Sequence, residues 1–142
     1  MSPQRHNRYV LDSSAVGAYL SRSPGCVEVE QILEAARARK TAAYLTVFGL
    51  SEVLTKEELN GGLAASQRAW ERIQQLPIRL TDVDRALAIA AAHIRAKYGL
   101  RDADVFATAL AERQHAVLVT NREEYKKVES VVAIKWLPPT EP

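Results

Sequence analysis

Short, nearly continuous apolar segments that alternate with longer helical ones are the feature of this sequence that most restricts its fold. The segments with strand character are 9–11, 42–46, 77–80, 116–120 and 131–137. Runs of this kind are typical of strands buried on both faces of a parallel sheet, because helices cover both sides of such a sheet. The alternation therefore predicts an α/β fold, a three-layer α/β/α sandwich with a parallel sheet.

The stretches between these segments carry helix signals. Apolar spacing, capping residues and Gly or Pro breaks predict helices from Ala15 to Pro24, Val27 to Lys40, Val47 to Leu59, Leu63 to Ile73, a Thr81 or Asp82 cap to Tyr98, and Asp102 to Arg113. The chain has 142 residues, of which 47% are hydrophobic. This size predicts a single domain over residues 1–142, with flexible tails at about 1–7 and 138–142.

Composition excludes several classes of protein. The single cysteine, Cys26, rules out an internal disulfide, and the three histidines are too scattered for a zinc-ligand spacing, so any metal must be held by oxygen. No apolar run reaches the roughly 20 residues of a membrane span, and the start lacks the apolar middle of a secretory signal, which predicts a cytoplasmic protein. The net charge of +2 does not by itself indicate nucleic-acid binding.

Polar residues at strand ends indicate where a site would lie. In parallel sheets ligands bind beyond the carboxyl ends of the strands, and Asp12 and Thr120 each end a predicted strand. In the helix from Asp102, a stripe at offsets of three, four, seven and eight is apolar, so Asp102 is predicted to face inward. Asp104 lies about 200° around the helix at roughly 100° per residue, and is predicted to point away.

Glu52 is a further candidate, because helical spacing places it on a face with Leu45, Phe48 and Leu59. A cluster of inward carboxylates is unfavourable unless a cation neutralises it, and Mg²⁺ or Mn²⁺ fits oxygen ligands. Each acid also has a purely structural interpretation. Asp12 and Asp102 could be helix caps, and Glu52 could be an ordinary exposed charge.

Four segments together resemble the motifs of the PIN-domain family. VLDSSAV resembles the first motif, TVFGLSEVL the second with Glu52 as its acid, DADVFATALAE the third with Asp102 in the acidic position, and HAVLVTNREEY the fourth, in which Thr120 ends a strand ahead of Tyr125. The motifs occur in the family's order over nearly the whole chain. The chain is therefore similar to the toxin ribonucleases of toxin–antitoxin pairs, the VapC type, and a PIN-like sandwich is expected.

The resemblance implies a Mg²⁺- or Mn²⁺-dependent endoribonuclease. Asp12, Glu52 and Asp102 would be the catalytic residues and metal ligands, with Ser13 and Thr120 as possible supporting residues. It further implies an RNA substrate, a cognate antitoxin protein and a homodimer. Candidates for RNA contacts, most of which are expected to be ordinary solvated charges, are Arg22, Arg37, Arg39, Lys40, Arg101, Arg122, Lys126 and Lys127.

One position departs from the family pattern. Many members have Asp two residues after the strand-end Thr, whereas this chain has Arg122, and Glu123 could replace the missing acid or the position could be dispensable. Arg122 favours an alternative in which the chain is a catalytically weak or inactive PIN-like module that binds RNA or protein. A phosphatase with a strand-end Asp nucleophile is less favoured, because VLDSS lacks a second Asp two residues on.

Overall fold

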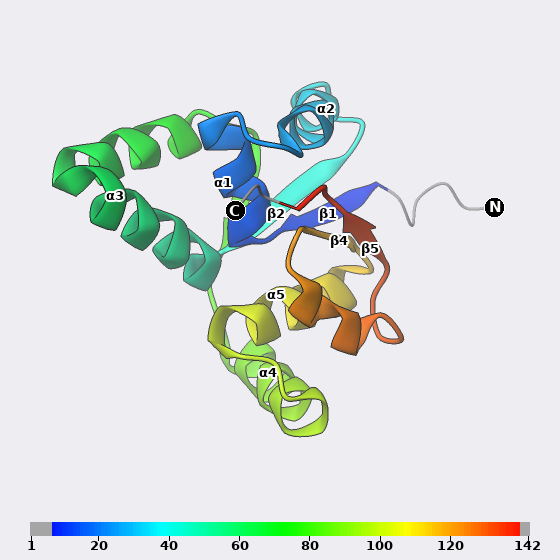
Figure 1. The fold of residues 1–142 in the computed structure, drawn as a ribbon. Helices are drawn as coiled ribbons and strands as arrows, with labels where there is room; N and C mark the ends of the chain where they lie inside the picture. The colour runs from blue at the N-terminus through cyan, green and yellow to red at the C-terminus, as the bar shows by residue number, and fades with distance from the viewer. Residues whose placement is uncertain (1–6, 140–142) are drawn as a thin grey trace.

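The computed structural model describes residues 7–139, and a parallel five-stranded sheet forms the centre of the fold (Figure 1). Its strands are β1 (Arg8–Leu11), β2 (Ala42–Thr46), β3 (Ile78–Thr81), β4 (Val117–Thr120) and β5 (Ile134–Trp136), in the order β3-β2-β1-β4-β5. The helices are α1 (Ser13–Ser21), α2 (Cys26–Arg37), α3 (Val47–Gln74), α4 (Arg85–Tyr98), α5 (Asp102–Gln114) and the 3₁₀ helix η2 (Glu123–Val128). The predicted tails lie mostly outside the described residues.

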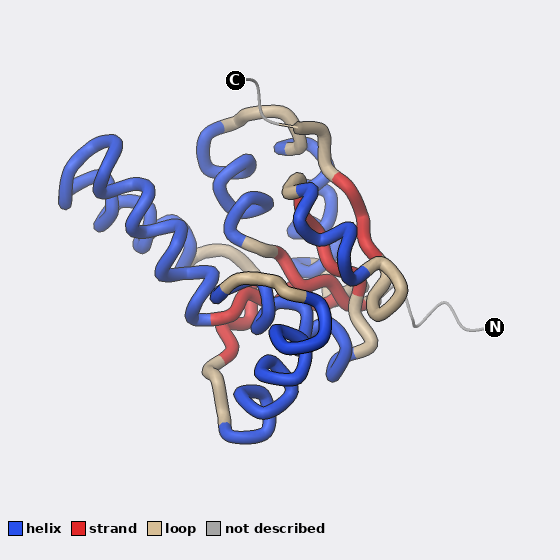
Figure 2. The backbone as a smooth tube through the Cα atoms, turned by 60° about the horizontal axis from the view of Figure 1, so that its bottom comes forward, coloured by secondary structure: helices blue, strands red, loops and turns tan. Residues whose placement is uncertain are grey.

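Helices cover both faces of the sheet, as Figures 1 and 2 show. Successive side chains of a strand point to opposite faces. Val10 of β1 and Leu118 of β4 therefore pack in one cluster with α4, α5 and η2, while the next residues, Leu11 and Val119, pack in another with α1, α2 and α3. The predicted three-layer α/β/α sandwich is confirmed.

The chain changes direction across the sheet between its two central strands. From β1 it continues to β2 and β3 on one side, then crosses back to β4 and β5 on the other. The carboxyl ends of β1 and β4 thus meet where the crossover connections diverge and leave a crevice. Asp12, directly after β1, and Thr120, the last residue of β4, lie in this place, and the backbone N–H of Asp12 donates to the carbonyl of Val119 at 3.2 Å.

Most predicted elements are present, with shifted ends. Asp12 itself caps α1, and Asp84 rather than Thr81 or Asp82 caps α4, because these carboxylates accept the free N–H groups of Ala15 and Leu87. The last strand covers only 134–136 of the predicted 131–137. No helix within residues 7–139 is long and apolar enough to cross a membrane.

The two helices predicted on either side of Asn60 form one long projecting arm, α3, at the left of Figure 1. Its direction changes at Gly62, which has φ 83° and ψ 175°. This backbone conformation is accessible almost only to glycine, because a Cβ would clash with the chain's own backbone. The helix break predicted between Leu59 and Leu63 is therefore confirmed, and the arm consists of two helices that meet at Gly62.

We expect Gly62→Ala to lower the free energy of unfolding by about 1–3 kcal/mol, because alanine is strained at this φ and ψ although the space around it is open. Gly17→Ala is the matched control. Gly17 is helical and equally uncrowded, so alanine there should raise stability by about 0.5–1 kcal/mol. Urea unfolding followed by circular dichroism measures both, and equal effects of the two substitutions would contradict the strained bend.

Candidate functional site

The carboxylate of Asp12 joins three elements at the carboxyl ends of the central strands. Its Oδ1 accepts hydrogen bonds from the Ala15 N–H at 2.9 Å and the Ser14 hydroxyl at 2.6 Å. Its Oδ2 accepts from the Thr120 hydroxyl at 2.6 Å. The side chain is buried, with 4% of its surface exposed. Asp12 therefore connects β1, the first turn of α1 and the end of β4.

Burial is the main influence on the charge of this residue. The pKa of Asp12 is raised from 3.8 to about 6, mainly by burial and to a smaller extent by the nearby charge of Asp104, against the opposing effect of the hydrogen bonds from Ser14, Thr120 and Ala15. The protein thus holds a carboxylate where ionisation is unfavourable. Groups with raised pKa values in a crevice are common in functional sites.

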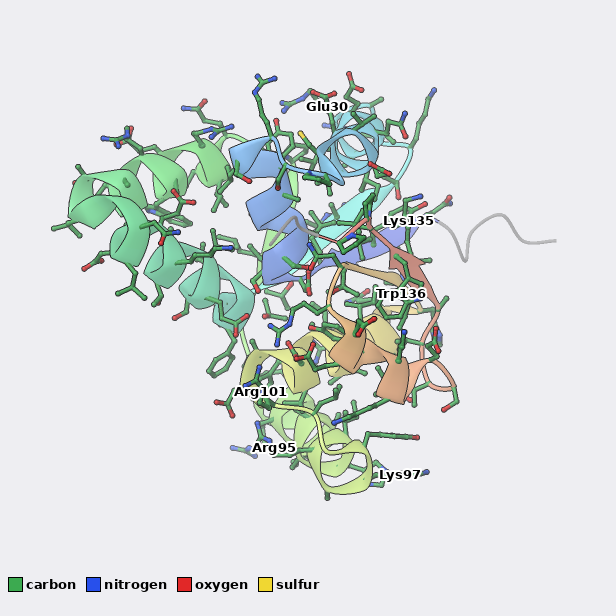
Figure 3. All side chains as sticks on the ribbon, viewed as in Figure 1. Glu30, Arg95, Lys97, Arg101, Lys135 and Trp136 are labelled. Atoms are coloured by element: carbon green, nitrogen blue, oxygen red, sulfur yellow. The ribbon has the colours of Figure 1, made fainter. Side chains whose placement is uncertain are left out.

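The inward acid of α5 is Asp104, and the prediction that Asp102 faces inward is wrong. The Asp102 side chain is 94% exposed and pairs with Arg95 of α4 at 3.6 Å. Figure 3 shows Arg95 at the periphery of the molecule. Asp104, predicted to point away, is only 3% exposed.

The error has a physical cause. α5 packs against the sheet, α4 and α3, so almost every residue from Ala103 to Ala111 is buried and no single apolar stripe defines its inner face. Phe106, taken as an inward residue, is only half-buried and stacks on the exposed Phe48 with ring centroids 4.4 Å apart. The better signal was the small residues three, four and seven positions after Asp104, because small side chains let a helix approach a sheet closely.

Asp104 is held by two neighbours from beyond β4. The Tyr125 hydroxyl donates to its Oδ1 at 3.0 Å, and the Arg122 guanidinium lies 3.2 Å from its Oδ2. The Oδ2 contact is an ion pair without hydrogen-bond geometry, so this buried oxygen accepts no hydrogen bond. Burial raises the pKa of Asp104, and the charges of Glu52 and Glu124 add to that effect while Arg122 and Tyr125 oppose it.

Glu52 reaches the same region from α3. Its Oε1 accepts a hydrogen bond from the Ser13 hydroxyl at 2.7 Å, which ties α3 to the start of α1. The reason given for it from sequence was only partly right. Leu45 belongs to β2, and Phe48 and Leu59 are 41% and 81% exposed, so Glu52 lies on a half-exposed face rather than an apolar one.

The acids after β4 do not replace a fourth carboxylate. Glu123 is 85% exposed and pairs with Lys126 at 3.4 Å. Glu124 lies 3.9 Å from Arg101 and 3.8 Å from Arg122, at the rim of the site. The inward side chain of this segment is that of Arg122, which sequence reasoning placed among candidate surface cations.

A groove of about 440 Å³ opens beside these residues. It runs between α1 and the first half of α3, and the loop after β4 closes one end. Glu52, Ser13 and Arg122 border it at the acidic end, and Lys56 and Asn60 lie farther along α3. Of the three candidate acids, Glu52 lines the groove directly, and Arg122 and Ser14, the neighbours of Asp104 and Asp12, line it as well.

The donor set fits a hard divalent cation in its chemistry. Asp12, Glu52 and Asp104 supply carboxylate oxygens, which Mg²⁺ and Mn²⁺ prefer, and the buried Oδ2 of Asp104 accepts no hydrogen bond. The described residues contain no group of three His, Cys, Asp or Glu side chains already gathered around one point. Binding would thus require side chains such as the half-exposed Glu52 to turn inward.

Comparisons with known proteins agree with this geometry. The family model of the PIN domain, compared with this sequence, matches residues 9–131, so the chain belongs to the PIN-domain family. No curated protein sequence is similar enough to count as a match.

Solved structures share the fold at low sequence identity. VapBC2 from Rickettsia felis, bound to a DNA fragment from its promoter, superposes with a TM-score of 0.74 at 14% identity over 92% of this chain and 98% of that chain. DNA-bound VapBC from Salmonella typhimurium superposes with a TM-score of 0.71 at 17% identity, over 90% of this chain and 96% of that chain. VapC20 from Mycobacterium tuberculosis, described as a sarcin-ricin loop cleaving toxin, superposes with a TM-score of 0.60 at 13% identity, over 78% of this chain and 86% of that chain. The chain therefore has the fold found in VapC-type toxins.

We expect Asp12→Asn to stabilise the metal-free protein at pH 7.5. The folded state binds the Asp12 proton more tightly than the unfolded chain, so the stability due to this residue is complete below about pH 4 and falls as the pH rises to about 6. A pKa shift of this size corresponds to a loss of folding free energy on the order of 3 kcal/mol at pH 7.5. Asparagine keeps the size and the Ala15 contact without the buried charge.

Thermal unfolding in chelator at pH 7.5 and pH 4 measures this effect. Asp12→Asn should raise the melting temperature at pH 7.5 and change it little at pH 4. The exposed Asp102→Asn is the control and should change neither. A lower melting temperature of Asp12→Asn at pH 7.5 would show that the buried charge is compensated in the folded protein.

Proposed function

We propose that this protein is a metal-dependent endoribonuclease and the toxin of a toxin–antitoxin pair. The observation that carries the proposal is the pair of buried carboxylates at the switch point of the sheet, Asp12 and Asp104, whose pKa values are raised by burial and by the nearby charges of Asp104 and Glu52, respectively. Membership of the PIN-domain family supports nuclease chemistry. The described RNA-cleaving activity of VapC20 supports RNA as the substrate.

Mg²⁺ or Mn²⁺ would be held by Asp12, Glu52 and Asp104, the last in place of the Asp102 expected from sequence. When bound, such an ion supplies an activated water and neutralises negative charge on the phosphate. The carboxylates would act as ligands, and their unfavourable burial in the metal-free protein is the reason that they would bind a cation strongly.

The surrounding residues position these ligands. Thr120 and Ser14 fix the plane of the Asp12 carboxylate, and Ser13 holds Glu52 beside the start of α1. Burial raises the pKa of Tyr125 well above its usual value, so its hydroxyl stays protonated and donates to Asp104. Such hydrogen bonds orient metal ligands and are the role proposed for Ser13 and Thr120.

The groove between α1 and α3 is the proposed path of the RNA. It leads directly to Glu52, and the hydroxyl and amide side chains of its lining, with the cations Lys56 and Arg122 beside Glu52 and Glu57, offer contacts to a sugar-phosphate chain. Gly17 and Ala18 on α1 leave the groove open. RNA bound along it would bring one phosphodiester to the acids.

We further propose a cognate antitoxin, a homodimer and a cytoplasmic site of action. The similarity to VapBC structures supports the antitoxin. The arm α3 exposes Leu59 and Leu63, which are 81% and 60% accessible, and α4 exposes Ile89 at 66%. Large apolar side chains at the surface support contact with further chains.

One observation favours a second function, that of a PIN-like binding module with weak or no catalysis. The Arg122 guanidinium pairs with Asp104 and so neutralises part of the acidic site. A binding module of this kind would retain RNA or protein binding and lack metal-dependent cleavage. The cleavage assay described next separates the two functions.

Asp104→Asn should abolish RNA cleavage, lowering its rate about 10²-fold or more, because a neutral amide no longer binds a hard cation strongly. Asp102→Asn should leave the rate within about twofold, since that side chain is exposed and faces Arg95. Cleavage of a structured RNA in Mn²⁺, with and without chelator, measures both variants.

Asp12→Asn serves as a second inactive variant in the same assay. Circular dichroism of every variant checks that the fold is kept. Loss of cleavage in Asp102→Asn with normal cleavage in Asp104→Asn would overturn the placement of the third acid. Cleavage that persists in chelator would overturn the metal mechanism, and RNA binding without cleavage by the unaltered protein would favour the binding module.

Light scattering tests the homodimer. At tens of micromolar we expect twice the monomer mass of 15.7 kDa. Leu59→Glu with Leu63→Glu on the arm should shift the population toward the monomer if the exposed apolar residues form the contact, because burying carboxylates there is unfavourable. A monomer at this concentration would contradict the dimer.

A further inference from the structure

Arg122 turns into the acidic site although it follows a strand end in a loop. Its backbone N–H donates to the Thr120 hydroxyl at 3.0 Å, which is the same hydroxyl that donates to Asp12. Its side chain is only 22% exposed and its Nη2 lies 3.2 Å from Asp104 Oδ2. The backbone of Arg122 is thus held by Thr120, and its guanidinium points at Asp104, a carboxylate that would bind the metal.

The contact with Asp104 is one between charges. Asp104 Oδ2 is buried, and no hydrogen bond satisfies it even though the Arg122 guanidinium is adjacent. The other oxygen, Oδ1, is already occupied by the Tyr125 hydroxyl. The positive charge of Arg122 therefore lies beside the one oxygen of Asp104 that accepts no hydrogen bond. A bound metal cation would take a similar position.

Charge balance indicates how many cations the site can take. When ionised, Asp12, Glu52 and Asp104 carry three negative charges, and Arg122 contributes one positive charge, which leaves a net charge of −2. One divalent ion neutralises this charge, while a second would leave an excess of +2 beside a fixed guanidinium. Glu124 and Arg101 at the rim add one negative and one positive charge, so the net charge stays at −2 when this pair is included, although Glu124 also lies 3.8 Å from Arg122.

We propose that Arg122 replaces a second metal ion, so that the site binds a single divalent cation. This inference rests on the proposed metal-dependent function and deepens it. The guanidinium also borders the groove, where it offers a phosphate a fixed positive charge and N–H donors. One metal ion and one arginine together then neutralise the three acids and face the substrate.

Counting bound Mn²⁺ on the full chain at pH 7.5, without RNA, tests the inference. Titration calorimetry and the loss of the free-ion electron paramagnetic resonance signal each give the number of ions per chain. The unaltered protein should bind one Mn²⁺. Arg122→Asp changes the net charge of the site from −2 to −4 and should bind two.

Lys127→Asp is the matched control, because it makes the same change of charge on the same segment at an exposed residue. It should bind one Mn²⁺, like the unaltered protein. Arg122→Gln removes the positive charge without adding an acid, and should bind its first Mn²⁺ about tenfold tighter or more, since a like charge has been removed beside the ion. This second variant keeps the test decisive if Arg122→Asp does not fold.

Each outcome has a defined meaning. Two ions on the unaltered protein, or an unchanged affinity in Arg122→Gln, would overturn the role of Arg122 and leave the metal-dependent nuclease intact. Two ions on Lys127→Asp would overturn it as well, because general surface charge would then suffice. If neither the unaltered protein nor Asp104→Asn binds Mn²⁺, the proposed metal mechanism and this inference are both overturned.

Discussion

The buried carboxylate of Asp12 is the interaction on which the rest of this structure depends. It ends β1, caps α1 through the Ala15 N–H and accepts the Thr120 hydroxyl from β4, so one side chain ties together the switch point of the sheet. Its burial is unfavourable, and the hydrogen bonds only partly offset the desolvation. A fold that keeps such a group sacrifices stability at the place where a ligand would bind.

The electrostatics of the site follow from this first charge. Asp104 is brought beside it by α5 and is stabilised by Tyr125 and Arg122, both from the segment after β4. The segment after β4 thus contributes the partners of Asp104. The start of α1 contributes the partner of Glu52 and, together with Thr120 of β4, the partners of Asp12. A cation held by these acids and a substrate in the groove would therefore both lie beside Arg122.

The alternation of strands and helices was predictable, because buried parallel strands require apolar runs and their connections require helices. Asp12 and Glu52 were predicted as site residues for a similarly local reason, since a strand end and a motif can be seen in the sequence. Asp102 was chosen over Asp104 because a helix was assumed to have one buried stripe. α5 is buried on several sides, so its apolar pattern does not identify the face that meets the crevice.

Local sequence by itself determined the ends of the two strands before Asp12 and at Thr120, the helix break at Gly62 and the residue types available for chemistry, because these depend on short-range sterics and on burial pattern. Only the tertiary structure decided which acids meet. The side chain of Arg122 gave no sign in the sequence that it would pair with Asp104, eighteen positions earlier, rather than with solvent. Such a pairing depends on how closely α5 approaches the sheet, and that distance is set by the packing of residues remote from both side chains.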